Sequence, residues 1–145
     1  MRHVKLLQII DANLNRGREG LRVCEDIARF VILDKDAAVS LKNIRHAMTA
    51  VLLRSKILSL KKLLQMRDTE KDILKHIDFK KCKGCNIDDI FMANIERVKE
   101  SLRVLEECSK IIDENISRKY RHLRFNAYDV EKKVVTFTRA VSGTR

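Results

Sequence analysis

Apolar residues in the first quarter of the chain recur at alternating spacings of three and four. This spacing places side chains on one face of an α-helix, where they can be buried together. It predicts a single long helix over most of residues 4–33, which ends near Asp34 and Asp36. The expected buried stripe consists of Leu7, Ile10, Leu14, Gly17, Leu21, Cys24, Ala28 and Val31.

Further helices are expected along the rest of the chain, and no alternating strand pattern of useful length is present. The second and third helices should span residues 37–54 and 56–66. A short helix over 69–77 could be capped by Asp68, and 78–86 reads as a loop. Asn86 or Asp88 could cap a helix that runs to about Asn115, and Ser117 could cap a last helix that runs to about residue 140. The sequence thus predicts an all-α fold without a sheet.

The chain contains an internal repeat. Residues 12–25 (ANLNRGREGLRVCE) and 93–106 (ANIERVKESLRVLE) are identical at eight of fourteen positions. One helical pair cannot bury its own apolar stripe, so two copies should pack together. We therefore expect one domain over 1–145, a pseudo-twofold bundle from a duplicated long-helix/short-helix unit. The repeats should cover about 4–55 and 86–140, joined by a basic linker over 56–85.

Basic residues are concentrated in the middle of the chain. The formal net charge is +11, and residues 40–85 contribute twelve basic and four acidic side chains. Such a segment could bind nucleic acid or a small phosphorylated ligand, or it could be a solvated surface. Phe79 is the only aromatic residue of this segment, which makes nucleic acid a less favoured partner.

The sequence gives no sign of a membrane span or a secretory leader. No apolar run approaches the ~18 residues that a membrane helix needs, and the first residues do not resemble a signal peptide. We therefore expect a cytoplasmic protein without a membrane partner. No glycine-rich phosphate loop is present either. Phosphate chemistry would have to use arginines, helix N-termini and a carboxylate-bound metal.

Polar residues recur in both copies of the repeat at every third position. An exposed salt-bridge ladder would explain the charged ones. It does not explain the asparagines, which are poor helix formers. Arginine binds phosphate through two parallel hydrogen bonds, and carboxylate and amide oxygens can ligate Mg²⁺. The set consists of Asn13, Arg16, Glu19, Arg22 and Glu25, with Asn94, Arg97, Glu100, Arg103 and Glu106 in the second copy.

Two glycines distinguish the first copy from the second. Glycine inside a helix costs about 1 kcal/mol relative to alanine, so Gly17 and Gly20 suggest close approach of another group. That group could be a neighbouring helix at Gly17 and a ligand at Gly20. The second copy has Val98 and Ser101 at these positions. We therefore expect a ligand pocket to lean on the first repeat.

The segments IIDANLNRGREGLRVCEDIARFV, LKNIRH, RDTEKD, ANIERVKESLRVLEE and LRFNAYDVEK, in this order, resemble a known thiamine-biosynthesis domain. It is the all-helical domain found ahead of thiamine-phosphate synthase in some bacteria, and also alone. That family is understood as an alternative hydroxymethylpyrimidine phosphate kinase. The resemblance implies phosphorylation of hydroxymethylpyrimidine phosphate to its diphosphate, with ATP and Mg²⁺. It also suggests the synthase as a partner, and two chains could form a homodimer.

The resemblance carries functional positions onto this chain. Glu19, Asp26 and Asp68 are the expected catalytic residues, and Glu19 and Glu100 the expected Mg²⁺ ligands. One departure stands out, because this chain lacks both glycines of the family's RDTxGDVG segment at residues 67–74. The expected phosphate- or ligand-binding residues are Asn13, Arg16, Arg22, Arg45, His46, Arg67, Asn94, Arg97, Arg103 and Arg124.

Three alternatives to the kinase stay open at this point. A non-catalytic scaffold or docking module for the synthase would use the polar ladder as an interface. A nucleic-acid-binding module would use the basic segment, and its affinity would fall steeply with salt. An all-helical mutase or similar small-anion enzyme would share the arginines but ignore ATP.

Overall fold

The structure is a computed structural model, and it describes residues 1–75 and 85–143, the side chains of 139–142 excepted. The part of the chain that it describes is helical and contains no strand, so the predicted all-α class is confirmed. A π-helical turn continues the first helix directly. The elements are α1 (Arg2–Ile27), η1 (Ala28–Ile32), α2 (Lys35–Arg54), α3 (Leu60–Met66), α4 (Ile87–Ser109) and α5 (Glu114–Ser142).

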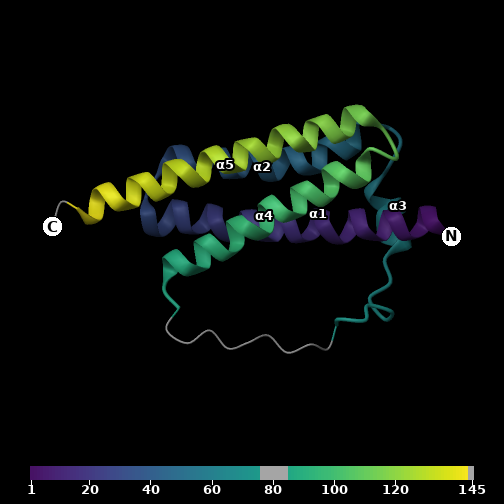
Figure 1. The fold of residues 1–145 in the computed structure, drawn as a ribbon, viewed down its shortest axis with the longest axis horizontal. Coiled ribbons are helices and arrows are strands. Elements are labelled where there is room, and N and C mark those ends of the chain that lie inside the picture. Colours follow the sequence, from purple (N-terminus) through teal and green to yellow (C-terminus); the bar gives the residue numbers. More distant parts are fainter. Residues whose placement is uncertain (76–84, 144–145) are drawn as a thin grey trace.

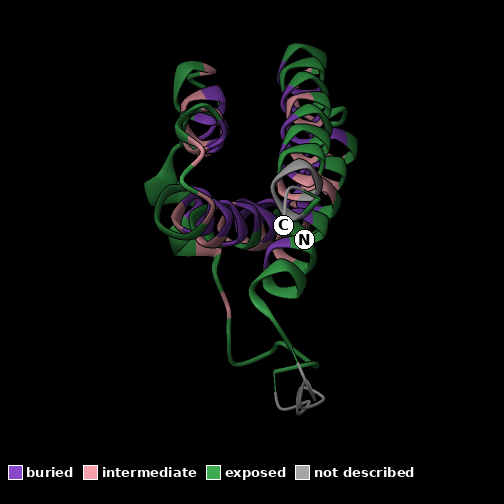
Figure 2. Cartoon of the chain, turned by 90° about the vertical axis from the view of Figure 1, so that its left-hand side faces the viewer, coloured by how far each residue is buried: buried purple, intermediate pink, exposed green. Residues whose placement is uncertain are grey.

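The four long helices form two antiparallel hairpins, α1 with α2 and α4 with α5 (Figure 1). Helix α1 packs on α4, and α2 packs on α5, so that each long helix has two neighbours. Buried residues lie where the helices face one another (Figure 2). The most completely buried side chains include Ile10, Leu21, Leu41, Met48, Ile95, Leu102, Leu105 and Tyr120.

Local sequence signals explain where the helices begin. The side chain of Asp34 accepts a hydrogen bond of 3.0 Å from the Ala37 amide and caps α2. Asn86 and Asp89 form a reciprocal capping box at the start of α4, with bonds of 2.9 and 3.1 Å. Such caps satisfy amides that have no partner within the helix. Of the two caps expected for this helix, Asn86 is the one used.

Several predicted boundaries are wrong. Helix α3 begins at Leu60 rather than at residue 56. Residues 69–75 form turns rather than a helix, while 76 and 77, like most of the expected 78–86 loop, lie outside the described residues. Helix α4 ends at Ser109 and α5 already begins at Glu114. Ser117 is therefore not a helix cap. Its hydroxyl donates instead to the carbonyl of Glu106 at 2.7 Å and joins α5 to α4.

The apolar stripe of α1 is buried from Leu7 to Ala28, as predicted, but Val31 is 54% exposed. The π-helical turn explains this difference, because a π turn takes more residues than an α turn and changes the direction in which later side chains point. Leu33 then adopts a left-handed conformation, with φ of 60°, and ends the helix.

Gly20 allows α1 to approach α4 closely, and Gly17 leaves room for a side chain of α2. A Cβ atom at Gly20 would lie 3.0 Å from the carbonyl oxygen of Asn94 and 3.1 Å from Cγ2 of Val98. One at Gly17 would lie 2.5 Å from Cε of Met48. Both glycines are thus explained by helix packing, and the expected approach of a ligand at Gly20 is wrong.

Within the described residues, no helix is both long and apolar enough to cross a membrane.

Candidate functional site

A buried ion pair joins the two helices of the first hairpin. Arg45 of α2 donates to Glu25 of α1 from Nε at 2.9 Å and from Nη2 at 3.4 Å. The Glu25 side chain is only 6% exposed. Arg45, expected to bind phosphate, is therefore already the counter-ion of a buried carboxylate. Such pairs hold a fixed geometry because neither charge can be left alone in the interior.

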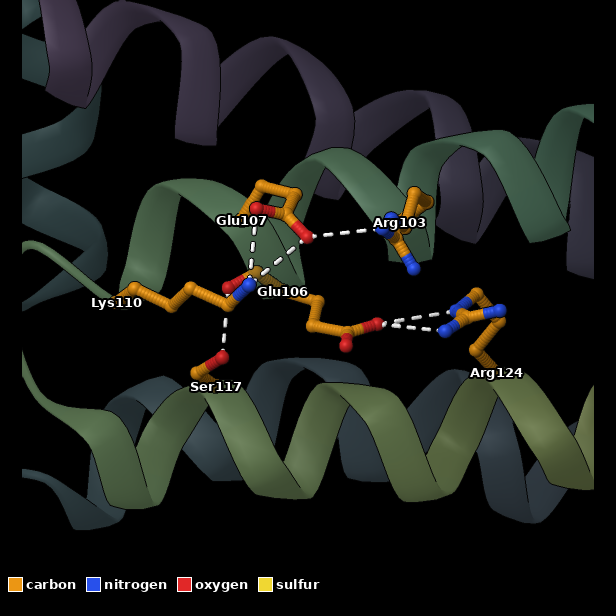
Figure 3. A network of polar contacts seen from close by, with 6 residues as sticks. All are labelled: Arg103, Glu106, Glu107, Lys110, Ser117 and Arg124. Atoms are coloured by element: carbon orange, nitrogen blue, oxygen red, sulfur yellow. Dashed lines mark hydrogen bonds and ion pairs between the residues drawn. The ribbon is translucent and has the colours of Figure 1, made fainter.

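The second hairpin contains the corresponding pair. Nε and Nη2 of Arg124 lie 3.0 Å from Oε2 of Glu106 (Figure 3). Beside it, Arg103 and Lys110 both contact the exposed Glu107, and these cations lower the pKa of that carboxyl, Lys110 most strongly. The matching pairs support the internal duplication, which itself stays a prediction, as do the boundaries of the two repeats.

An open groove of about 300 Å³ lies between α1 and α2, next to the buried pair. It brings together three residues expected from the sequence, Glu19, Arg22 and Arg45. Its other lining residues are Asn15 and Arg18. Since all but Arg45 come from one face of α1, the groove concentrates arginines around the carboxylate of Glu19.

Arg18 is the residue of this groove that sequence reasoning missed. Its Nε is buried and has no hydrogen-bond partner within the described part of the chain. Among the described residues it also takes part in no ion pair, whereas Arg22 lies 3.7 Å from both Glu25 and Asp26. The repeat could have revealed it, because its counterpart Lys99 is also a cation.

The segment after α3 is attached to the same face of α1. Arg67 donates to both carboxylate oxygens of the buried Asp11, at 2.7 and 2.8 Å, and these bonds raise the pKa of Arg67. One turn later, Asn15 donates to the carbonyl of Asp11 at 3.0 Å. Arg67 and Asp68 are thus held beside the helix face that continues into the groove. Asp68 accepts from the Lys71 amide, which lowers the pKa of its carboxyl.

The remaining expected residues lie elsewhere. The amides of Asn13 and Asn94 donate to carbonyls of their own helices, at 2.9 and 2.8 Å. His46 lines a different groove, which also includes Lys119 of α5. The expected set is therefore not one compact site. Outside the α1–α2 groove, and exposed on their helices, are Arg16, Arg97, Glu100 and Arg103.

The expected Mg²⁺ ligands are separated as well. Glu19 lines the groove, but Glu100 does not. Across residues 1–75 and 85–143, no three His, Cys, Asp or Glu side chains gather as a metal site. The oxygen donors of the groove are Glu19 and Asn15. This set fits a cation bound by one carboxylate together with the phosphate oxygens of a ligand, a common arrangement for Mg²⁺.

Comparison with known proteins gives a consistent picture. Thiamine-phosphate synthase of Prochlorococcus marinus subsp. pastoris (strain CCMP1986 / NIES-2087 / MED4) is 34% identical over 143 residues, covering 92% of this chain and 36% of that protein. The synthase of Synechococcus sp. (strain CC9605) is 35% identical over 144 residues, covering 97% and 38%. The chain therefore spans little more than a third of these relatives. No solved structure matches it.

The fold is that of a small all-helical domain, and the similar proteins show that such a domain also forms part of longer proteins. The family model of the ThiD2 family matches residues 8–133. The chain belongs to the ThiD2 family.

Proposed function

We propose that this protein acts in thiamine biosynthesis, as a kinase that uses ATP and Mg²⁺ to convert hydroxymethylpyrimidine phosphate to its diphosphate. Membership of the ThiD2 family supports this proposal, and so do the names of the relatives. The observation that carries it is the α1–α2 groove, where Arg18 and Arg22 flank the carboxylate of Glu19.

Phosphoryl transfer depends on charge neutralisation and on in-line placement of the reacting oxygens. Arg18 and Arg22 supply positive charge to the groove. Arg45 engages Glu25 through Nε and Nη2, so its Nη1 is the nitrogen left for a phosphate oxygen. Because Glu25 fixes that side chain, little further ordering is needed when an anion binds.

Glu19 is the best placed of the expected acidic residues. Asp26 faces Arg22 at 3.7 Å, and Asp68 accepts from Lys71. The Glu19 carboxylate lines the groove and makes no ion pair within the described part of the chain. It can hold Mg²⁺ beside the attacking oxygen, which belongs to the phosphate of hydroxymethylpyrimidine phosphate and is already ionised near neutral pH. Bound Mg²⁺ would supply charge neutralisation for the transferred phosphoryl group.

A coupled assay of ADP formation tests the proposal. Formation of ADP should require Mg²⁺ and hydroxymethylpyrimidine phosphate, and the unphosphorylated pyrimidine serves as comparison. Glu19→Gln should lower turnover at least a hundredfold with an unchanged melting temperature. Glu114→Gln is the control, because Glu114 is an exposed acid on α5, far along the chain from the groove. ADP formation that is equal in both variants would contradict the assignment of Glu19.

A second candidate function is that of a non-catalytic partner of thiamine-phosphate synthase. The relatives that carry this name are far longer than this chain. The end of the first hairpin also exposes apolar side chains that a partner could cover, with Phe30 65% and Leu33 75% exposed. This candidate predicts no ADP formation, no nucleotide effect on melting, and co-purification with the synthase. Loss of that co-purification in Phe30→Ser would locate the contact.

A further inference from the structure

Lys99 in the second hairpin corresponds to Arg18 in the first, and the two hairpins neutralise these cations differently. In the second hairpin, Nζ of Lys99 lies 2.9 Å from Oε2 and 3.2 Å from Oε1 of Glu131, and it also contacts Glu96. Burial alone would lower the pKa of Lys99, but the hydrogen bonds to Glu96 and Glu131 outweigh it and raise the pKa. The cation of this hairpin is thus satisfied by the chain itself.

In the first hairpin the corresponding cation, Arg18, has no such acid among the described residues. The corresponding arginines of the two hairpins, Arg45 and Arg124, lie 79 residues apart. At the same spacing, the residue of the first hairpin that corresponds to Glu131 is Leu52. Leu52 is an apolar core residue that is 1% exposed. No other carboxylate pairs with Arg18 in the described part of the chain, and its Nε is a buried donor without an acceptor there. A buried donor that stays unsatisfied costs free energy, so turning the Arg18 guanidinium, which lines the groove, toward an acceptor from outside the chain would be favourable.

The surroundings of Arg18 select the kind of acceptor. The groove is open, and it also presents the Arg22 guanidinium, whereas the Asn15 amide already donates to Asp11. Guanidinium groups match the geometry of phosphate oxygens. Glu19 also lines this groove, and its carboxylate would repel an anion that binds alone. A divalent cation bound between the carboxylate and the phosphate would remove this repulsion.

We infer that Arg18, together with Arg22, binds a phosphate group in the α1–α2 groove, and that Glu131 takes the place of this ligand in the second hairpin. The inference rests on the proposed function for the molecule that carries the phosphate. A nucleotide and a phosphorylated pyrimidine share this chemistry.

Calorimetric titration with inorganic pyrophosphate in the presence of Mg²⁺ tests the site without any turnover. Arg18→Gln and Arg22→Gln should each weaken binding about tenfold or more, the equivalent of one lost charge-assisted hydrogen bond. The control Arg118→Gln removes an equal charge from the exposed surface of α5 and should stay within twofold. Two variants are used because Arg18 is partly buried, whereas the Arg22 side chain is 56% exposed and its loss should not disturb folding.

Three results would overturn the inference. The first is a wild-type protein that binds no pyrophosphate, and the second is a control that weakens binding as much as the two variants do. The third is a loss of binding in Arg103→Gln, in the second hairpin, without a loss in Arg22→Gln.

Competition identifies the molecule that carries the phosphate. Displacement of pyrophosphate by ATP alone assigns the site to the nucleotide, and displacement by hydroxymethylpyrimidine phosphate alone assigns it to the acceptor substrate. Binding that depends on Arg18 in a protein that forms no ADP supports the site and contradicts the kinase.

Discussion

Removing one partner of a buried ion pair should be far more destabilising than removing an exposed charge. Glu106 and Arg124 join α4 to α5 with side chains that are 7% and 12% exposed. Arg124→Met keeps most of the side-chain volume but leaves the Glu106 carboxylate without its cation. Breaking such a pair typically costs about 3–5 kcal/mol. In a domain of this size, each kcal/mol lowers the melting temperature by roughly 3–4 °C, so a fall of about 10–20 °C is expected.

Two comparison variants separate this cause from general damage. Replacing both residues, as in Glu106→Met with Arg124→Met, removes the stranded charge and should restore most of the lost stability. Arg118→Met breaks an exposed pair with Glu114, whose side chains are 69% and 73% exposed, and should cost less than about 1 kcal/mol.

Urea denaturation followed by circular dichroism measures these three variants and the single variant Glu106→Met. The reasoning fails if Arg124→Met costs no more than Arg118→Met. It also fails if the double variant is as unstable as the sum of the two single changes, because the loss would then come from packing rather than from an unpaired charge.

Three further changes test other features of the fold. Gly20→Ala should lower the free energy of unfolding by about 1–3 kcal/mol in urea titration, because its Cβ would lie 3.0 Å from the carbonyl oxygen of Asn94; a stability gain would contradict the close packing. Asp11→Asn should weaken the attachment of Arg67, so that amide hydrogen exchange rises over residues 60–75 but not in α5. Burial raises the pKa of the Cys24 thiol to about 12, so in the folded protein it should not react with a disulfide reagent at pH 8. Because the unfolded thiol ionises first, this group should destabilise the fold as the pH rises from about 8.5 towards 12, and denaturation of Cys24→Ala at several pH values should lack this contribution.

Much of the fold could be predicted because it depends on local periodicity. The stripe from Leu7 to Ala28 is buried as expected, since residues three and four apart share a helix face. Val31 was missed because a π turn leaves no clear sign in the hydrophobic pattern. The cap at Ser117 was also misplaced, since its hydroxyl serves a contact between helices rather than a helix end.

The site was harder to predict because it depends on contacts between distant segments. Glu19, Arg22 and Arg45 were expected and do line one groove. The docking of Arg67 on Asp11 joins positions 56 residues apart, which no local pattern reveals. Arg18 was overlooked because no acidic side chain pairs with it among the described residues. This difference becomes visible only when Arg18 is compared with Lys99, its paired counterpart in the second hairpin.

The π-helical turn also bears on how the chain accommodates changes in length. Its wider turn absorbs the equivalent of a one-residue insertion, and it begins at Ala28, the last buried position of the stripe. The insertion therefore leaves the register of the preceding buried side chains intact. Deleting one residue from 28–32 would convert the turn to regular α-helix and leave Leu33, the exposed residue that ends it, close to its present direction. This end of the hairpin can thus gain or lose a residue during evolution, whereas the same change near Gly17 would turn one half of the stripe away from the core.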